Sequence, residues 1–120
     1  MRRYVDLAER LREAVLKGQG ETATSLRQAA AAYSARLGGQ PETRVDVEEI
    51  PDHLRELVDK TARHAYRVTD EEIAALRQAG YSEDAIFEVA ISAAVGGGLA
   101  RLKRGLAALA APAASEGGRR

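Results

Sequence analysis

Apolar residues recur every three or four positions along most of the chain, the spacing that places them on one face of an α-helix. Residues 4–15 show this pattern first, with charged residues on the other face, and Lys17 and Gly18 mark a helix end. The segment therefore predicts an amphipathic helix. Its apolar positions are Tyr4, Leu7, Ala8, Leu11, Ala14 and Val15.

A second helix is predicted to end at Gly38-Gly39, with Thr22 or Thr24 as its N-cap. Residues 40–50 are polar and acidic, and their alternation of valines is too short for a strand, so they indicate a connector. The residues expected to point inward from the second helix are Leu26, Ala29, Ala30, Tyr33 and Leu37.

A third helix is predicted after the connector. Pro51 suits a first helical turn because it has no N–H to leave unpaired, and Asp52 lies at the positive end of the dipole. The expected inner residues of this helix are Leu54, Leu57, Val58, Thr61 and Ala65.

Two further helices follow, each with a recognisable cap. Thr69 and Glu72 have the spacing of a capping box, and Gly80 closes the short helix that they open. Ser82 then suits the N-cap of a long final helix with acidic residues in its first turn. Because residues 85–95 are apolar nearly all round, this helix is expected to be buried on most sides.

The elements predict an all-α bundle of about five helices with a long C-terminal helix at its centre. Residues 1–110 form a single domain in this prediction, and residues 111–120 form a flexible tail. Gly96-Gly97-Gly98 is unusual inside a helix, because three glycines cost on the order of 2–3 kcal/mol relative to alanine. Close packing against another helix, in this chain or in a second subunit, would offset that cost. A kink beside a ligand is the alternative interpretation.

Composition narrows the classes of function. The 18 basic and 18 acidic side chains balance, whereas nucleic-acid binders usually carry a basic surplus, so no nucleic-acid partner is expected. The most apolar stretch, 85–100, is too short to span a bilayer, and no signal-peptide pattern follows Arg2-Arg3. The prediction is a cytoplasmic protein without a membrane partner. A core rich in alanine and poor in aromatic residues favours a homo-oligomer.

Residues 65–88 resemble the core helical hairpin of the alkylhydroperoxidase-D-like superfamily, which includes the carboxymuconolactone decarboxylases. The shared features are a helix that ends at Gly80, the acidic, serine-capped start at Ser82 and the small residues 93–98. The resemblance extends over about 54–109 and implies that family's helical fold. It also implies where the family's active site would lie.

The family's reactive residues are missing from this chain. Counting back from Gly80, the two cysteine positions of the family fall on Ala65 and Val68, and its histidine position falls on Glu72. The resemblance would imply peroxidase activity, but that chemistry requires a thiolate and the chain contains no cysteine. Thiol-dependent peroxidase activity, disulfides and zinc–cysteine sites are therefore excluded.

Glu72, His64 and Tyr66 are the candidate catalytic residues if the family's pocket survives, because a carboxylate, an imidazole and a phenol can move protons. Glu72 equally fits a purely structural role in the capping box, and His64 suits a helix C-terminus. His53 and His64 match no familiar metal-ligand spacing, so neither a metal nor a cofactor is expected.

Two hypotheses about function follow. The first is a non-peroxidatic alkylhydroperoxidase-D-like protein that acts as an oligomeric structural module or binds a small molecule or a protein partner. The second is a cofactor-free enzyme similar to the carboxymuconolactone decarboxylases that uses acid–base residues in place of cysteines.

Overall fold

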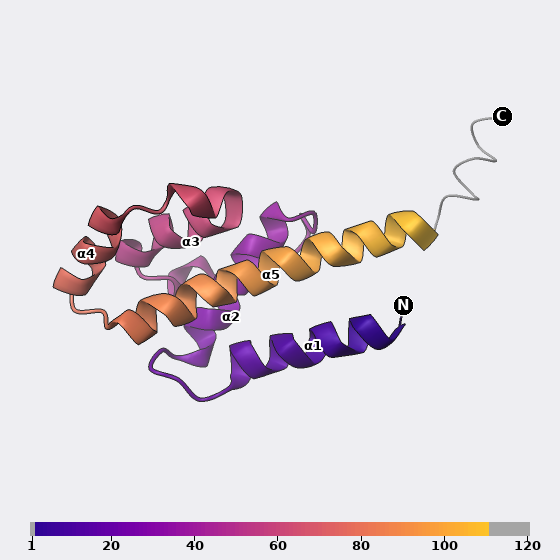
Figure 1. The fold of residues 1–120 in the computed structure, drawn as a ribbon, viewed down its shortest axis with the longest axis horizontal. Coiled ribbons are helices and arrows are strands. Elements are labelled where there is room, and N and C mark those ends of the chain that lie inside the picture. Colours follow the sequence, from indigo (N-terminus) through magenta and orange to yellow (C-terminus); the bar gives the residue numbers. More distant parts are fainter. Residues whose placement is uncertain (1, 111–120) are drawn as a thin grey trace.

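The computed structural model describes residues 2–110, and within them all regular structure is helical. Five α-helices and two short 3₁₀ helices follow one another along the chain (Figure 1). The predicted tail at 111–120 lies outside the described residues. The elements are α1 (Arg2–Lys17), α2 (Thr24–Leu37), η1 (Val47–Glu49), α3 (Asp52–His64), η2 (Ala65–Arg67), α4 (Asp70–Gln78) and α5 (Glu83–Ala110).

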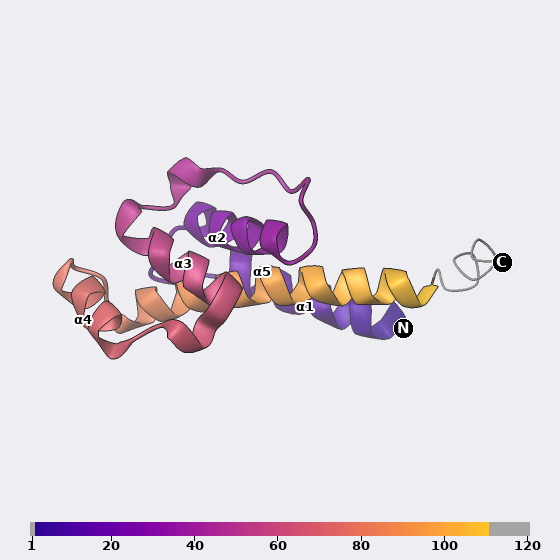
Figure 2. The ribbon, with the colours of Figure 1, turned by 90° about the horizontal axis from the view of Figure 1, so that it is seen from above.

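Helix α5 is the central helix, and the other helices pack along it. α1 runs antiparallel beside its C-terminal half, while α3, η2 and α4 lie along its N-terminal half (Figure 1). Seen from above, α2 lies on one side of the layer that α1 and α5 form (Figure 2). The all-α class and the long central C-terminal helix are therefore confirmed.

The core lies where α2, α3 and α5 meet. Ile50 belongs to it although the sequence assigned residues 40–50 to a connector, because η1 turns this side chain toward α3. The fully or nearly buried apolar residues of this core include Leu26, Ala29, Ala30, Ile50, Leu54, Leu57, Val58, Leu76, Ile86, Val89 and Ala93.

Glycines allow α2 and α5 to cross closely. A Cβ added to Gly96 would lie 2.2 Å from the carbonyl oxygen of Ala31, and one added to Gly97 would lie 2.6 Å from Ser34 Oγ. Nothing lies within 4 Å of the corresponding point at Gly98. Two of the three glycines are thus explained by packing within the chain, and only Gly98 faces outward.

The caps of α4 and α5 are as predicted. In the capping box, the backbone N–H of Glu72 donates to Thr69 Oγ1 (3.2 Å), and the Thr69 N–H donates to Glu72 Oε1 (3.2 Å). Ser82 Oγ accepts from the N–H of Ala85 at 3.0 Å. These hydrogen bonds fix the starts of α4 and α5, because they satisfy N–H groups that would otherwise lack partners.

The start of α2 differs from its prediction. Ala23 occupies the N-cap position without a side-chain hydrogen bond, and Thr22 instead donates through Oγ1 to Glu88 on α5 (2.7 Å). The turn between α1 and α2 is also tied by Arg27, which is buried and donates to the carbonyl oxygens of Val15 and Gly18. Pro51 similarly precedes α3 as its N-cap rather than occupying its first turn.

Two helices leave more apolar surface exposed than their sequences suggested. α5 is buried on one side only, and Phe87, Leu102 and Leu109 on its other side are exposed. On α1, Leu16 is buried, whereas the apolar residues Tyr4, Leu7 and Leu11 are exposed. The expectation that the final helix is buried on most sides is therefore wrong for this single chain.

The length of α5 also changes one argument drawn from the sequence. By length and apolar composition alone, the whole helix is long enough to cross a membrane, although its most apolar stretch, residues 85–100, is too short by itself. Core helices of proteins that never enter a membrane satisfy the same test, and one side of α5 packs on α2 here. This feature is weak support for a membrane span.

Candidate functional site

An open apolar groove lies between α5 and the segment formed by α3, η2 and α4. Its volume is about 530 Å³, within the range of about 300–1,000 Å³ that is usual for small-molecule sites. Nine of its eleven lining residues are apolar, so the groove favours a ligand without charged groups. The lining comprises Leu57, Thr61, Ala65, Val68, Ile73, Glu83, Ile86, Phe87, Ala90, Ile91 and Ala94.

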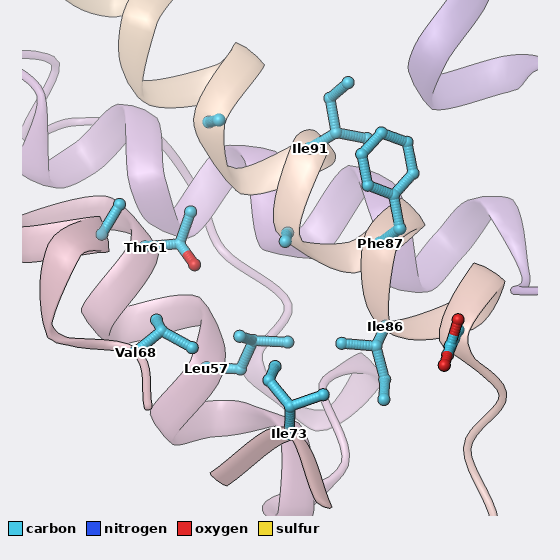
Figure 3. A pocket seen from close by; sticks show the side chains of 11 residues that line it. Leu57, Thr61, Val68, Ile73, Ile86, Phe87 and Ile91 are labelled. Atoms are coloured by element: carbon cyan, nitrogen blue, oxygen red, sulfur yellow. The ribbon is translucent and has the colours of Figure 1, made fainter. Parts of the chain in front are cut away.

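The two walls of the groove come from different helices. Leu57 and Thr61 lie one turn apart on α3, and Ile73 extends their wall from α4. The opposite wall is α5. The side chains of Ile86 and Phe87, which are neighbours in the sequence, leave this helix in different directions (Figure 3). Alanine at positions 90 and 94 keeps the space between the walls open, because a larger side chain there would fill it.

Polar groups are few in this groove. The hydroxyl of Thr61 is on one wall (Figure 3). Glu83, the first residue of α5, lies at the end of the groove where that helix begins. Glu83 is exposed and forms an ion pair with Arg77 at 2.8 Å. The groove thus offers one hydroxyl for a hydrogen bond and a carboxylate that would repel an anion near it.

Ala65 and Val68, the positions that the family resemblance assigns to cysteines, both line the groove. In the sequence, both positions mark missing chemistry, and Ala65 is also expected on the inner side of the third helix. The other lining residues were assigned to the core or to helix faces, because an apolar side chain in a groove and one in a core give the same sequence pattern. No local signal separates the two cases here.

The candidate acid–base residues lie elsewhere. Glu72 lines a smaller cavity with His53 and Glu56. His64 and Tyr66 pack edge to face with their ring centroids 5.7 Å apart, and both side chains are exposed. The structure therefore brings His64 and Tyr66 together, and it places Glu72 with a different histidine.

Glu72 is engaged by groups that stabilise its charged form. Lys60 Nζ donates to Glu72 Oε1 at 2.5 Å, and Thr69 adds hydrogen bonds from its N–H and its hydroxyl. The hydrogen bond from Lys60, followed by those from Thr69, lowers the pKa of Glu72. A lowered pKa makes the carboxylate a weaker base, which suits the structural role more than proton abstraction.

A second polar cluster joins α2 to α3. The hydroxyl of Tyr33 donates to Asp59 Oδ1 at 2.5 Å, and Arg63 Nε donates to the same carboxylate at 2.9 Å. The hydrogen bond from Tyr33, with that from Arg63, lowers the pKa of Asp59, and the Tyr33–Asp59 hydrogen bond raises the pKa of Tyr33.

Among residues 2–110, no group of three or more His, Asp or Glu side chains is placed to hold a metal ion.

Comparison of this chain with protein-family models, with curated proteins and with solved structures gives no match.

The capping role of Glu72 gives a direct prediction. Thr69→Ala should lower the free energy of unfolding by about 1 kcal/mol through loss of the cap. Glu72→Gln should cost less than Thr69→Ala, because glutamine also serves in capping boxes. Urea unfolding measures both changes.

Thr24→Ala is the matched control, since Thr24 begins α2 without capping it and its replacement should have almost no effect. A Glu72→Gln variant less stable than Thr69→Ala would contradict the capping account and show that the ion pair with Lys60 dominates.

Proposed function

We propose that this chain is a non-peroxidatic alkylhydroperoxidase-D-like protein that binds an uncharged apolar small molecule in the groove between α3 and α5. The observation that supports it most is that Ala65 and Val68 line an open apolar groove. At the positions that the resemblance assigns to the family's dithiol, the chain thus has a binding surface without a nucleophile.

The chemistry of the groove defines the class of ligand. Binding between apolar walls is favoured by a free energy of about 25 cal/mol for each Å² of apolar surface that is removed from water. The Glu83 carboxylate at one end disfavours a fatty-acid or sulfonate group there, while Thr61 can pair with one hydroxyl or carbonyl. An uncharged, elongated or aromatic molecule with at most one or two polar atoms fits these conditions.

The acid–base enzyme hypothesis receives less support from the same geometry. Glu72, which lines a different cavity, is bound by Lys60 and Thr69. His64 and Tyr66 line neither that cavity nor the groove. If Glu72 nevertheless acted as a general base, Glu72→Gln would reduce turnover by roughly a hundredfold or more.

Binding of the uncharged dye Nile red tests the proposal. The wild type should bind the dye with a rise in fluorescence, and Ala90→Phe should weaken the affinity at least about tenfold by filling the groove. The anionic dye 1-anilinonaphthalene-8-sulfonate should bind more weakly than Nile red because of Glu83.

Ala108→Phe is the matched control. It adds the same side chain at an exposed position five turns further along α5 and should leave the affinity unchanged. Circular dichroism and thermal melting confirm that each variant folds. Equal dye affinity in the wild type and in a folded Ala90→Phe variant would refute binding in the groove.

A further inference from the structure

A polar cleft lies between α1, α2 and the connector that leads from α2 to η1. It shares no residue with the groove between α3 and α5. Its volume is about 530 Å³, within the usual range for small-molecule sites. Eight of its ten lining residues have charged or polar side chains, so this polar cleft suits a charged, water-soluble ligand, whereas the groove suits an uncharged one.

Four charged side chains of the polar cleft form no ion pair within residues 2–110. They are the guanidinium groups of Arg12 and Arg44 and the carboxylates of Asp46 and Glu49. A guanidinium group binds a carboxylate through two parallel hydrogen bonds, and a carboxylate accepts hydrogen bonds from an ammonium group. The cleft therefore has partners for both charges of a zwitterion.

The two guanidinium groups lie toward one end of the polar cleft. Arg12 lines the cleft and also a smaller neighbouring cavity, and it shares both with Ala32 and Thr43. Arg44 follows Thr43 directly in the sequence. Arg12 from α1 and Arg44 from the connector thus flank the end of the cleft at Ala32, where a ligand's carboxylate would be stabilised.

The two carboxylates follow along the connector. In Figure 2 the connector leaves the C-terminal end of α2 and runs back beside this helix toward α3. Asp46 precedes η1 and Glu49 ends it, so both come after Arg44 in the direction of the start of α2. Lys17 also lines the cleft, but its charge is balanced by Glu13 at 3.0 Å. A ligand's ammonium group is therefore favoured on the side of η1.

The length of the polar cleft matches a short peptide. Ser25 and Ala32, which both line it, are seven residues apart on α2, a rise of about 10 Å. Three residues of extended peptide also span about 10 Å. Between the two ends, the hydroxyl of Ser25 and the amide of Gln28 can form hydrogen bonds with peptide groups.

We propose that the polar cleft binds a peptide of about three residues with free termini. Its C-terminal carboxylate lies between Arg12 and Arg44, and its ammonium group lies beside Asp46 and Glu49. This binding does not depend on the ligand of the groove. Inorganic phosphate fits less well than a peptide, because it would use the guanidinium groups alone and the two carboxylates would repel it.

Titration with trialanine, followed by the protein's backbone amide NMR signals, tests the proposal. The signals of Ser25, Gln28 and Ala32 should shift and saturate, while those of Ile86 and Ile91 in the groove should stay in place. N-acetyl-trialanine, which lacks the ammonium group, and trialanine amide, which lacks the carboxylate, should each bind at least about tenfold more weakly.

Three outcomes of this titration would overturn the proposal. The first is the absence of a saturating shift up to about 20 mM trialanine. The second is equal affinity for trialanine and N-acetyl-trialanine, or binding of inorganic phosphate as tight as that of trialanine, since either result would leave an anion site only. The third is equal affinity for trialanine and its amide, which would show that the guanidinium groups do not hold the carboxylate.

Variants assign each terminus to its partner. Arg12→Gln and Arg44→Gln should each weaken trialanine at least about tenfold and leave the affinity for trialanine amide unchanged. Arg10→Gln, on the same helix but outside the cleft, is the control and should change neither affinity. Glu49→Gln should weaken trialanine but not N-acetyl-trialanine, with Glu48→Gln as its control. Folded Arg12→Gln and Arg44→Gln variants that bind trialanine as tightly as the wild type would contradict the proposal.

Discussion

Gly96→Ala is expected to lower the free energy of unfolding by at least about 2 kcal/mol, because an added Cβ makes a shorter contact here than at any other glycine within residues 2–110. The new Cβ would lie 2.2 Å from the carbonyl oxygen and 2.5 Å from the Cα of Ala31. These are backbone atoms, so α2 and α5 would have to move apart. The gain in helix propensity, about 1 kcal/mol, cannot offset that movement.

Gly98→Ala is the matched control two residues away. Its Cβ would meet nothing within 4 Å, so the same gain in propensity should raise stability by up to about 1 kcal/mol. Urea unfolding at low protein concentration, where association contributes little, compares the two variants. If Gly96→Ala were as stable as Gly98→Ala, the close crossing of α2 and α5 would be wrong.

The second large effect is expected at Glu88. Its carboxylate accepts from the N–H of Glu21 (2.8 Å), the N–H of Thr22 (2.9 Å) and the hydroxyl of Thr22 (2.7 Å), and so joins α5 to the turn between α1 and α2. Glu88→Ala leaves these donors without partners and should cost about 2–4 kcal/mol. Denaturant unfolding measures the loss, and Glu88→Gln, which keeps one acceptor oxygen, should lie between the alanine variant and the wild type.

Stability should also depend on pH through this carboxylate. Burial raises the pKa of Glu88, but the hydrogen bonds from Thr22 and Glu21 outweigh it and leave the pKa below its ordinary value. The carboxylate therefore stabilises the fold above the unfolded pKa of about 4.3, and this contribution is lost as pH falls through the folded value. Between about pH 5 and pH 3, the wild type should lose more stability than Glu88→Gln. Parallel curves for the two proteins would contradict this role.

The sequence predicted those parts of the fold that depend on local signals. Thr69 with Glu72, and Ser82 with its acidic neighbours, identified two helix starts because capping is set by residues within one turn. The glycine run at 96–98 indicated a close helix contact. It did not indicate which helix makes the contact, and the structure shows that Gly96 and Gly97 meet α2 of the same chain.

Long-range contacts could not be predicted in this way. Glu88 is the one acidic residue within the apolar stretch 85–100, and its partners lie 66 and 67 residues away in the sequence. The pattern of α1 showed an apolar face but not what covers it, and Tyr4, Leu7 and Leu11 are exposed in the single chain. The groove could not be predicted from the sequence for the same reason. Residues that line a groove and residues in a core have the same apolar pattern, and they differ only in whether another part of the chain packs on them.

Methyl-resolved NMR tests the central claim, binding of an uncharged apolar molecule in the groove, most directly. During titration with Nile red, the methyl signals of Leu57, Ile86 and Ile91, which line the groove, should shift together and saturate. The methyl signals of Leu16 and Leu26, buried outside the groove, should stay in place. Shifts confined to Leu7, Leu11 and Leu109 on the exposed face, with the groove signals unchanged, would contradict the account.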